Sequence, residues 1–407
     1  MTNFWEKIEK PIIGMSPMDG VTDACFRFIV AKHGRPDVIF TEFVNAETAF
    51  HAPHALIRDL TYSEIERPVV AQIYGHTPEM FYKVAHIVCG LGFDGLDINM
   101  GCPAKKVAAK GSGAALILTP ELAKSIMRSA AQGVRDWFAG QTLGDLALDP
   151  ELIRGVALAN RLRTGLEGPP APRVIPLSVK TRLGYDEVVV QDWIETLLEE
   201  KPAVVSLHGR TLKQKYTGRA DWEAIACAVA VARGSGTLIL GNGDLQNMRD
   251  AERRVRETGV AGVLFGRGAQ GDPWMFQTKG QVKEAVRSNL PARIHELPIG
   301  LEERFSVMLE HAGYFERHWG LRAFPGMRKH LAWYCRSFRG AAELRFKLVR
   351  VNNVGDVVAC LDNYMRSAAL SAESSDVLLH EHDHESPSDA LTALSQIEGR
   401  SRLLSPA

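Results

Sequence analysis

The chain has 407 residues, of which 45% are hydrophobic and 24% are charged, as is ordinary for a soluble globular protein. Its 48 basic and 48 acidic residues cancel, which taken alone argues against a nucleic-acid-binding protein. No apolar run approaches the roughly 18 residues of a membrane span, and Met1–Lys10 lacks the apolar segment of a secretory signal. Six scattered cysteines without CxxC spacing indicate no disulfide framework. We expect a cytoplasmic, monomeric protein with no membrane partner and no metal site.

Short apolar runs alternate with amphipathic helical patterns over the first two-thirds of the chain. The predicted strands are Ile12–Met18, Val38–Val44, Val69–Tyr74, Gly95–Met100, Val174–Lys180, Val204–His208, Leu238–Asn242 and Gly262–Gly266. The predicted helices between them include Ala24–His33, Glu79–Leu91, Glu121–Ala131, Trp193–Glu200, Trp222–Val231 and Met248–Thr258. Strands that alternate with helices form a parallel sheet, and eight such units are the count of a closed (β/α)₈ TIM barrel. We assign this α/β barrel to residues 1–292, with an open doubly wound sheet as the alternative.

One connection in the barrel is unusually long and covers about residues 133–172. Within it, Glu151–Arg163 has helical spacing, with apolar residues recurring on one face. A cluster of glycine and proline follows at Gly165–Pro172 and is typical of turns. The sequence therefore predicts an additional helical segment beside the barrel.

After Ala292 the strand patterns stop, and a small all-α domain is predicted for residues 293–370. Its helices are expected at Glu302–Arg317, Met327–Ser337 and Ala341–Val351. Nine basic residues and a single acid lie between Arg317 and Arg350, which fits a phosphate-binding face or, alternatively, a solvated helix surface. Residues 371–407 are acidic with little apolar periodicity, and we expect them to be a disordered tail.

Polar residues recur at the carboxyl ends of the predicted strands, where parallel barrels carry their reactive groups. They are Ser16, Pro17 and Met18 with Asp19, Gln72, Asn99 to Pro103, Lys180 to Arg182, His208 to Arg210, Asn242 to Asp244, and Gly266 to Gly268. Each is a weak signal alone. Their recurrence on strand after strand predicts a functional site at this rim.

The loops after the last two strands are the usual phosphate site of such barrels. Gly243 and Gly266 would let backbone N–H groups approach a phosphate, and Arg267 adds a permanent cation, although ordinary glycine turns would show the same residues. Lys180 ends an otherwise apolar strand and needs an anionic partner, which the N1 edge of a reduced flavin would supply. A lone histidine is more often structural, but His208 on the neighbouring strand could donate to the same ring edge.

Cys102 lies between Gly101 and Pro103 in a turn that aims its thiol into the barrel mouth. The thiol could act as a nucleophile or as a general acid. No histidine is evidently paired with it, although His208 remains a candidate partner. A thiol of ordinary pKa, near 8.5, stays protonated at neutral pH and can donate to a carbanion. The other five cysteines lie in helical patterns and are predicted to be small core residues: Cys25, Cys89, Cys227, Cys335 and Cys360.

These motifs together resemble those of the tRNA-dihydrouridine synthases, and among them the bacterial B-type group. The strongest match is Asn99-Met100-Gly101-Cys102-Pro103 with Lys106-Val107 and Gly111-Ser112-Gly113-Ala114. Supporting motifs are Val179-Lys180-Thr181-Arg182, His208-Gly209-Arg210-Thr211, Gly241-Asn242-Gly243-Asp244, Gly266-Arg267-Gly268 and Met327-Arg328-Lys329-His330. The resemblance runs from about Pro11 to Val351. The long 133–172 segment and the acidic tail depart from the family pattern, which puts RNA docking in question rather than the chemistry.

The resemblance implies an FMN cofactor over the barrel mouth and NADPH as the reductant. Ser16, Pro17 and Met18 would line the ring, Gln72, Lys180 and His208 would contact its polar edge, and Asn242, Gly243, Asp244, Gly266 and Arg267 would hold the phosphate. It implies hydride transfer to C6 of a uridine in tRNA, with Cys102 protonating C5. Asn99 would hold the uracil edge. We further predict that Arg182, Arg210, Arg328 and Lys329 contact the tRNA substrate.

Two other functions are compatible with parts of this pattern. One is an FMN barrel that acts on a free pyrimidine, such as a dihydroorotate or dihydropyrimidine dehydrogenase, but this gives no reason for a basic helical domain. The other is an RNA-binding protein that keeps the barrel as an inactive scaffold, which the intact Cys102, Lys180 and His208 argue against. A flavin spectrum would separate the second, and assays on free uracil and on tRNA would separate the first.

Overall fold

The computed structural model describes residues 3–47, 51–166, 168–291, 294–295 and 298–376. Eight parallel strands close into a barrel in chain order, and β1 pairs with β8 from Ile12 opposite Gly262 to Met15 opposite Phe265. The strands are β1 (Ile12–Met15), β2 (Ile39–Asn45), β3 (Val69–Tyr74), β4 (Gly95–Met100), β5 (Leu177–Arg182), β6 (Val204–His208), β7 (Leu238–Asn242) and β8 (Gly262–Phe265). Because the strands close into a ring, the predicted TIM barrel is confirmed, and the alternative of an open doubly wound sheet is excluded.

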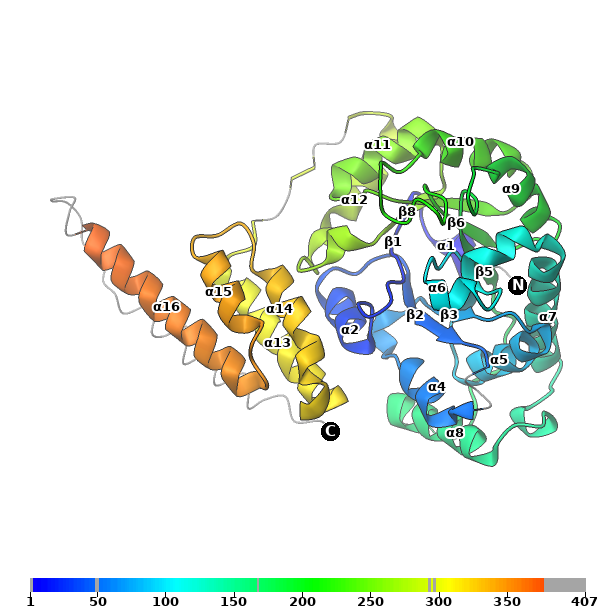
Figure 1. The fold of residues 1–407 in the computed structure, drawn as a ribbon, viewed down its shortest axis with the longest axis horizontal. Coiled ribbons are helices and arrows are strands. Elements are labelled where there is room, and N and C mark those ends of the chain that lie inside the picture. Colours follow the sequence, from blue (N-terminus) through cyan, green and yellow to red (C-terminus); the bar gives the residue numbers. More distant parts are fainter. Residues whose placement is uncertain (1–2, 48–50, 167, 292–293, 296–297, 377–407) are drawn as a thin grey trace. The chain divides into compact units, whose positions relative to one another are not determined.

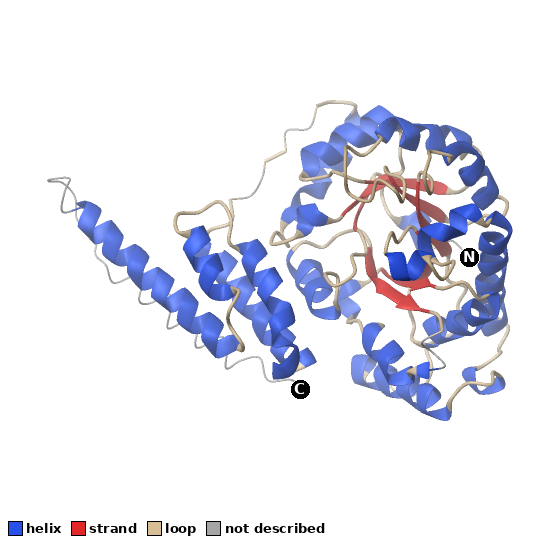
Figure 2. Cartoon of the chain, viewed as in Figure 1, coloured by secondary structure: helices blue, strands red, loops and turns tan. Residues whose placement is uncertain are grey.

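Most helices of this unit surround the strands on the outside of the barrel (Figures 1 and 2). The helices of the unit are α1 (Phe4–Lys7), α2 (Ala24–His33), α4 (Pro53–Asp59), α5 (Pro78–Gly90), α6 (Lys105–Ala108), α7 (Pro120–Phe138), α8 (Pro150–Thr164), α9 (Val190–Leu198), α10 (Trp222–Val231), α11 (Met248–Thr258) and α12 (Lys279–Ser288). Short 3₁₀ helices are η1 (Glu64–Glu66), η2 (Gly113–Leu118), η3 (Leu143–Asp145), η4 (Arg267–Ala269) and η5 (Met275–Thr278). Of the six predicted helices between the strands, α2, α10 and α11 have the expected bounds, and α5 and α9 differ by one to three residues at their ends. Helix α7 continues to Phe138, seven residues past its predicted end at Ala131.

The barrel interior is filled by apolar side chains in its lower part, and Trp5 of α1 packs against them. The cluster comprises Ile12, Val38, Phe40, Val70, Val204, Leu240 and Leu264. A second, larger apolar core lies between the strands and the surrounding helices. These layers fill the barrel below the carboxyl ends of the strands, so polar groups that face inward gather above them.

Two strand boundaries differ from the prediction because of proline. β1 ends at Met15 rather than Met18, and Pro17 has no N–H group to continue the ladder. β5 begins at Leu177 rather than Val174, directly after Pro176, and it continues to Arg182. The later end of β5 places Arg182 on the strand together with Lys180, which the predicted strand already included.

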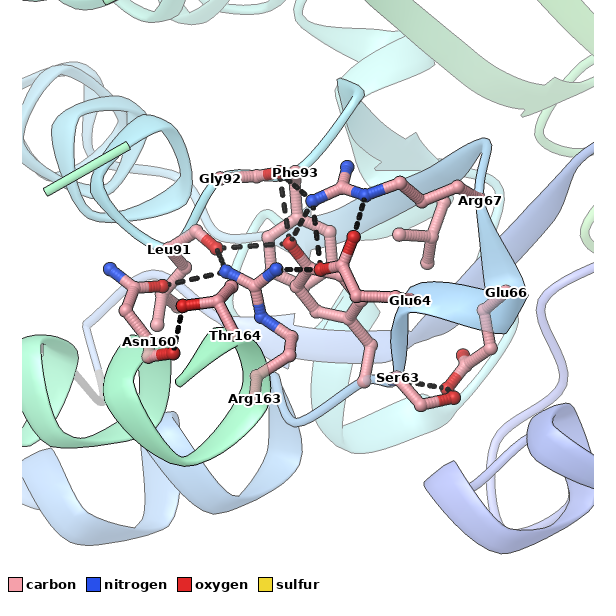
Figure 3. A network of polar contacts seen from close by, with 12 residues as sticks. Ser63, Glu64, Glu66, Arg67, Leu91, Gly92, Phe93, Asn160, Arg163 and Thr164 are labelled. Carbon is pink, nitrogen blue, oxygen red and sulfur yellow. Dashed lines mark hydrogen bonds and ion pairs between the residues drawn. The ribbon is translucent and has the colours of Figure 1, made fainter. Parts of the chain in front are cut away.

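The long connection carries helix α8, which overlaps the predicted helix Glu151–Arg163. Figure 3 shows how the end of α8 is anchored: Arg163 donates to the carbonyl of Leu91 at 2.9 Å and pairs with Glu64. Asn160 also donates to the carbonyl of Gly90, at 2.7 Å. Residues 90–94 lead into the amino end of β4. This end of the segment is therefore fixed to the barrel face opposite the carboxyl ends of the strands.

The remaining chain forms a second compact unit that begins at Pro298 and is entirely helical where it is described. Its elements are α13 (Leu301–Trp319), η6 (Leu321–Met327), α14 (Arg328–Tyr334), α15 (Ala341–Leu348) and α16 (Val354–Asp376). The first helices match the predicted ones to within a few residues. Phe305, Met308, Leu331, Leu344 and Leu361 are among its buried side chains.

Helix α16 was not predicted, and its end at Asp376 lies past the expected start of the disordered tail at residue 371. Its apolar stripe is short, with Val357 and Leu361 buried, and Asn353 accepts a hydrogen bond from the Asp356 N–H at 2.9 Å in its first turn. Residues 377–407 lie outside the described residues. Among the described helices, none is both long enough and apolar enough to cross a membrane.

The cysteines fit the core prediction only in part. Cys25, Cys89 and Cys335 are buried, as expected. Cys227 is exposed on α10, and the core prediction is wrong for it because its helix turns this position to solvent. Cys360 is half-buried.

Candidate active site

The strand register brings the predicted rim residues together inside the barrel. Asn99 of β4 lies beside Lys180 of β5, and His208 of β6 lies between Arg182 of β5 and Asn242 of β7. Neighbouring residues in register point to the same face of a sheet, and side chains alternate along each strand. These groups therefore form one polar layer at the carboxyl ends of the strands, above the apolar filling.

Lys180 places a cation in this layer without an ion pair among the described residues. Its Nζ donates to Oδ1 of Asn242 at 3.3 Å. Burial and the nearby Arg182 guanidinium lower the pKa of Lys180 to about 8, while the Asp97 carboxylate acts in the opposite direction. An ammonium with only an amide partner is well suited to an anionic ligand at the barrel mouth.

His208 is held as a neutral imidazole. Burial, together with the charges of Lys180 and of Arg182, lowers the pKa of His208 to about 2. Its buried Nδ1 has no hydrogen-bond partner within the described part of the chain. Buried polar atoms in native proteins are nearly always satisfied, so this atom indicates a ligand with a complementary polar edge.

Glycines lie in the loops after β7 and β8, and at Gly243 the backbone approaches a neighbouring segment closely. Gly243 has φ +132°, and a Cβ there would lie 2.7 Å from Cβ of Ala220. A Cβ at Gly266 would lie 3.5 Å from Sδ of Met18, which joins this loop to the predicted ring-lining segment. The Arg267 side chain is about half exposed, at 56%, and so can reach a ligand.

Asp244, which is partly exposed, and the buried Arg210 form an ion pair that supports that loop. The Arg210 guanidinium donates to both Asp244 oxygens, at 2.9 and 2.7 Å, and the Ala220 N–H donates to one of them at 2.7 Å. Burial opposes ionisation, but Arg210 and these hydrogen bonds hold the pKa of Asp244 below its usual value. Asp244 itself has φ +53°, so the pair stabilises a strained turn.

Ser16, Pro17 and Met18 follow β1 at the same rim. The Ser16 N–H donates to the carbonyl of Phe265 at 2.7 Å, and the Met18 N–H donates to Oγ1 of Thr22 at 2.9 Å. Ser16 is buried, whereas Pro17 and Met18 are half-buried. The segment is thus fixed at both ends and presents two partly accessible side chains.

Cys102 is buried, with 7% exposure, in the turn after β4. Oδ1 of Asn99 accepts from the N–H groups of Gly101 and Cys102, at 3.0 and 2.9 Å. Burial raises the pKa of the Cys102 thiol, against a backbone N–H at Ala104 that lowers it. Among the described residues, no histidine is hydrogen-bonded to the thiol, so the geometry favours a protonated general acid over a thiolate nucleophile.

Arg182 was predicted to contact substrate, but most of its donors serve the chain itself. It donates to the carbonyls of Gly101 at 2.7 Å, Thr211 at 3.0 Å and Lys215 at 3.1 Å. Arg210 likewise bonds Asp244 and the carbonyl of Gly218. Both side chains brace rim loops, and their contact with substrate stays a prediction.

Arg328 and Lys329 lie on α14 in the second unit. Arg328 donates to the carbonyl of Val351 at 2.8 Å and to Oδ1 of Asn352 at 2.8 Å, so it holds the connection between α15 and α16. Lys329 is exposed. Of the two, Lys329 is the better placed for contact with a phosphate.

Sequence inspection missed two carboxyl groups near the site. Asp97 is completely buried in β4, and a charged residue within an otherwise apolar strand was a signal that could have identified it. Glu42 lies where the pairing of β2 with β3 shifts register, between Phe40 and Phe43. Burial and, after it, the Asp23 carboxylate raise the pKa of Glu42 to about 7.

The described groups fit a flavin mononucleotide. The unpartnered His208 Nδ1 and the Lys180 ammonium would meet the polar edge of the ring, and the glycine turns with Arg267 would meet the phosphate. Cys102 adds a protonated thiol at the same mouth. The arrangement can therefore place a hydride donor and a proton donor against one substrate.

The chain is similar to known proteins over most of its length. The family model Dus, dihydrouridine synthase, matches residues 14–136 and 162–370. A probable tRNA-dihydrouridine synthase from Staphylococcus aureus (strain COL) is 31% identical over 370 residues, covering 89% of this chain and 95% of that protein. A probable tRNA-dihydrouridine synthase 2 from Bacillus subtilis (strain 168) is 32% identical over 370 residues, covering 89% and 97%. A solved DHODH from Eimeria tenella, in complex with ferulenol, has a TM-score of 0.44 at 13% identity and covers 69% of this chain and 83% of that one.

The family match is interrupted between residues 136 and 162. This gap lies inside the 133–172 connection, which was predicted to be longer than the family pattern. It ends at residue 370, so the acidic tail also lies outside it. Cys102, Lys180 and His208 all fall within the matched segments. The chain therefore belongs to the dihydrouridine synthase family of enzymes.

Proposed function

We propose that this enzyme uses FMN and NADPH to reduce specific uridines in tRNA to 5,6-dihydrouridine. The observation that carries the proposal is the protonated Cys102 thiol in the same barrel mouth as the Lys180 cation and the unpartnered His208 Nδ1. Relatives at 31–32% identity are named as tRNA-dihydrouridine synthases, which supports tRNA as the substrate. A free pyrimidine is the alternative substrate.

The cofactor residues divide by their chemistry. Lys180 and His208, with Gln72, would contact the polar edge of the ring, and Ser16, Pro17 and Met18 would line it. Asn242, Gly243, Asp244, Gly266 and Arg267 would form the phosphate end, with Asp244 acting through the turn that it stabilises. Bound and reduced by NADPH, FMN supplies the hydride that adds to C6 of the uracil.

Cys102 completes the reduction at the neighbouring carbon. Its S–H bond breaks, the proton goes to C5 of the uracil, and the thiolate regains a proton from water. The raised pKa of Cys102 keeps the thiol loaded with its proton at neutral pH. Lys180 stabilises negative charge at the ring edge, where preorganised charge is most effective.

The uridine must leave its base stack to reach a site at the bottom of the barrel mouth. Asn99 would hold the uracil edge through an amide hydrogen that its bonds within the chain leave free. Exposed basic residues of the helical unit, Lys329 among them, would contact tRNA phosphates.

Loss of the gene tests the proposal in cells. Dihydrouridine in total tRNA would be mapped with and without the gene, and then with a copy carrying Cys102→Ala. The proposal expects one or a few positions to lose the modification in the deletion strain and to stay unmodified with the variant. An unchanged map in the deletion strain would reject tRNA as the substrate.

A further inference from the structure

A buried chain of hydrogen bonds runs from the catalytic turn into the barrel. The N–H groups of Gly101 and Cys102 donate to Oδ1 of Asn99, at 3.0 and 2.9 Å. Nδ2 of Asn99 donates to Oε1 of Gln72 at 3.0 Å, and Nε2 of Gln72 donates to Oδ2 of Asp97 at 2.7 Å. Every bond therefore donates in the same direction, away from the turn and toward Asp97.

The end of this chain is a carboxyl group with no exposed surface. Asp97 is 0% exposed, and its other oxygen accepts from Oγ of Ser178 at 2.5 Å. Both side chains that donate to its oxygens, Gln72 and Ser178, are neutral, and the charge of Lys180 lowers its pKa. Burial raises the pKa of Asp97 to about 6, so it is ionised at neutral pH. Burying a carboxylate in this way is costly and calls for a function.

The two ends of this chain of hydrogen bonds, the backbone N–H groups of the turn and the Asp97 carboxylate, determine how both amides are oriented. The side-chain amides of Asn99 and Gln72 have nearly the same shape when flipped, so packing alone does not orient them. Backbone N–H groups can only donate, and an ionised carboxylate can only accept. With donors at one end and the acceptor Asp97 at the other, only one orientation of each amide satisfies every bond.

We propose that Asp97 is a positioning residue that orients the amides of Gln72 and Asn99 and thereby holds the turn carrying Cys102. It acts through these two side chains and touches neither substrate nor cofactor. Flipping the amides would face the Asn99 NH₂ group toward two backbone donors, and the turn would lose both of its bonds. The inference deepens the proposed function and rests on it for the role of Cys102.

These hydrogen bonds also determine which polar groups of Asn99 face a ligand. Each amide uses one N–H within the chain, and each NH₂ group has a second. In the observed orientation Asn99, at 6% exposure, keeps a donor at the site, whereas Gln72 is completely buried and fixes the orientation of the Asn99 amide. A flipped pair would offer a ligand a different set of groups at the same positions.

Two substitutions separate polarity from charge. In Asp97→Asn, the amide oxygen can still accept from Gln72 while its NH₂ group donates to Ser178, whose hydroxyl can also accept. In Asp97→Leu, the acceptor is gone. Ser178→Ala is the comparison variant: it removes the second bond to Asp97, and with it a contact that lowers the pKa of Asp97, but it leaves the acceptor for Gln72 in place.

The first readout is uridine reduction per FMN-loaded enzyme at about pH 7, where Lys180 is still mostly protonated and Asp97 is mostly ionised. We expect Asp97→Leu to lose about 10²-fold, as a misplaced catalytic group does, and Asp97→Asn and Ser178→Ala to lose less than about fivefold. Equal losses in Asp97→Asn and Asp97→Leu would show that the charge matters rather than the orientation of the amides. Full activity in Asp97→Leu would overturn the proposal.

The second readout does not depend on turnover. The rate at which iodoacetamide alkylates Cys102 is followed by mass spectrometry of its peptide, with the exposed Cys227 as the internal reference. Loss of the turn's two bonds should speed alkylation of Cys102 about tenfold in Asp97→Leu and leave Asp97→Asn near wild type. An unchanged rate in a folded Asp97→Leu protein would contradict the proposal. If wild type reduces no uridine, the proposed function fails, but this comparison still decides the role of Asp97.

Discussion

Nζ of Lys180 lies 3.3 Å from Oδ1 of Asn242, and the NH₂ group of the same amide donates to the carbonyl of Leu264 at 2.7 Å. β5 and β8 are thus linked through a side chain of β7. The bond to Leu264 orients the Asn242 amide, so that its oxygen faces the cation. Because an amide oxygen does not neutralise an ammonium, the charge of Lys180 remains available to an anionic ring edge.

Lys180→Ala and Arg267→Ala should therefore affect the enzyme differently. Removal of Lys180 should lower the midpoint potential of the bound flavin and slow uridine reduction, because the reduced ring loses its cation. Removal of Arg267 should weaken FMN retention during purification, because a charge-assisted bond to phosphate is removed. The measurements are the flavin content and the flavin midpoint potential of both purified variants. If the variants differed from wild type only in flavin content, and equally, this division of roles would be wrong.

The rate of uridine reduction should fall at alkaline pH because Lys180 loses its proton. Its pKa is lowered to about 8, so the residue is charged below that pH and becomes neutral above it. The rate should fall as the pH rises through about 8, while Cys102, whose pKa is raised, still carries its proton. In Lys180→Arg the guanidinium stays charged, so the decline should move to higher pH. A decline at the same pH in this variant would assign it to another group.

The same pH profile provides a check on Asp97. Its carboxylate raises the pKa of Lys180, and Asp97→Asn removes that charge without removing the hydrogen-bond acceptor. The alkaline decline should therefore begin at lower pH in Asp97→Asn than in wild type. Ser178→Ala, which leaves the carboxylate in place, should keep the wild-type profile. Identical profiles in all three proteins would mean that Asp97 and Lys180 do not interact.

Cys102→Ala should leave FMN bound and NADPH oxidation largely intact while uridine reduction falls. Removal of a positioned general acid typically costs about 10²–10⁴-fold. The measurement is dihydrouridine formed per FMN, beside NADPH oxidised in the absence of tRNA. Cys227→Ala, at an exposed cysteine, is the control and should match wild type. Normal turnover on tRNA by Cys102→Ala would remove the thiol from the mechanism.

The helical unit should contribute to tRNA affinity through its exposed basic residues. Lys329→Ala should weaken binding and flatten the plot of log affinity against log salt by about 0.7–0.9 for each phosphate that the protein no longer neutralises. Arg328 is less suitable alone, because its bonds to Val351 and Asn352 hold the unit together. Arg287→Gln, an exposed residue of α12, is the control and should keep the slope. An unchanged slope in Lys329→Ala would place the RNA-binding surface elsewhere.

The order of strands and helices was predictable because apolar periodicity and strand burial are local properties of the sequence. The gathering of Lys180, His208 and Asn242 followed from the barrel, since strand ends meet at one rim. The hydrogen-bond partners of Arg182 and Arg210 were not predictable. These partners are carbonyl and carboxylate groups that come from separate loops. The polarity of the hydrogen bonds through Gln72 and Asn99 likewise depends on contacts between strands. Helix α16 was missed because its apolar stripe is short.

Reduction of tRNA by the purified enzyme is measured with the FMN-loaded protein, NADPH and an unmodified tRNA transcript, with dihydrouridine counted by mass spectrometry. The proposed function predicts dihydrouridine at one or a few defined positions, in amounts matched by the NADPH oxidised. It predicts no comparable reduction of free uracil under the same conditions. Reduction of the free pyrimidine without reduction of tRNA, or an FMN-loaded protein inactive on the tRNAs of its own cell, would contradict it.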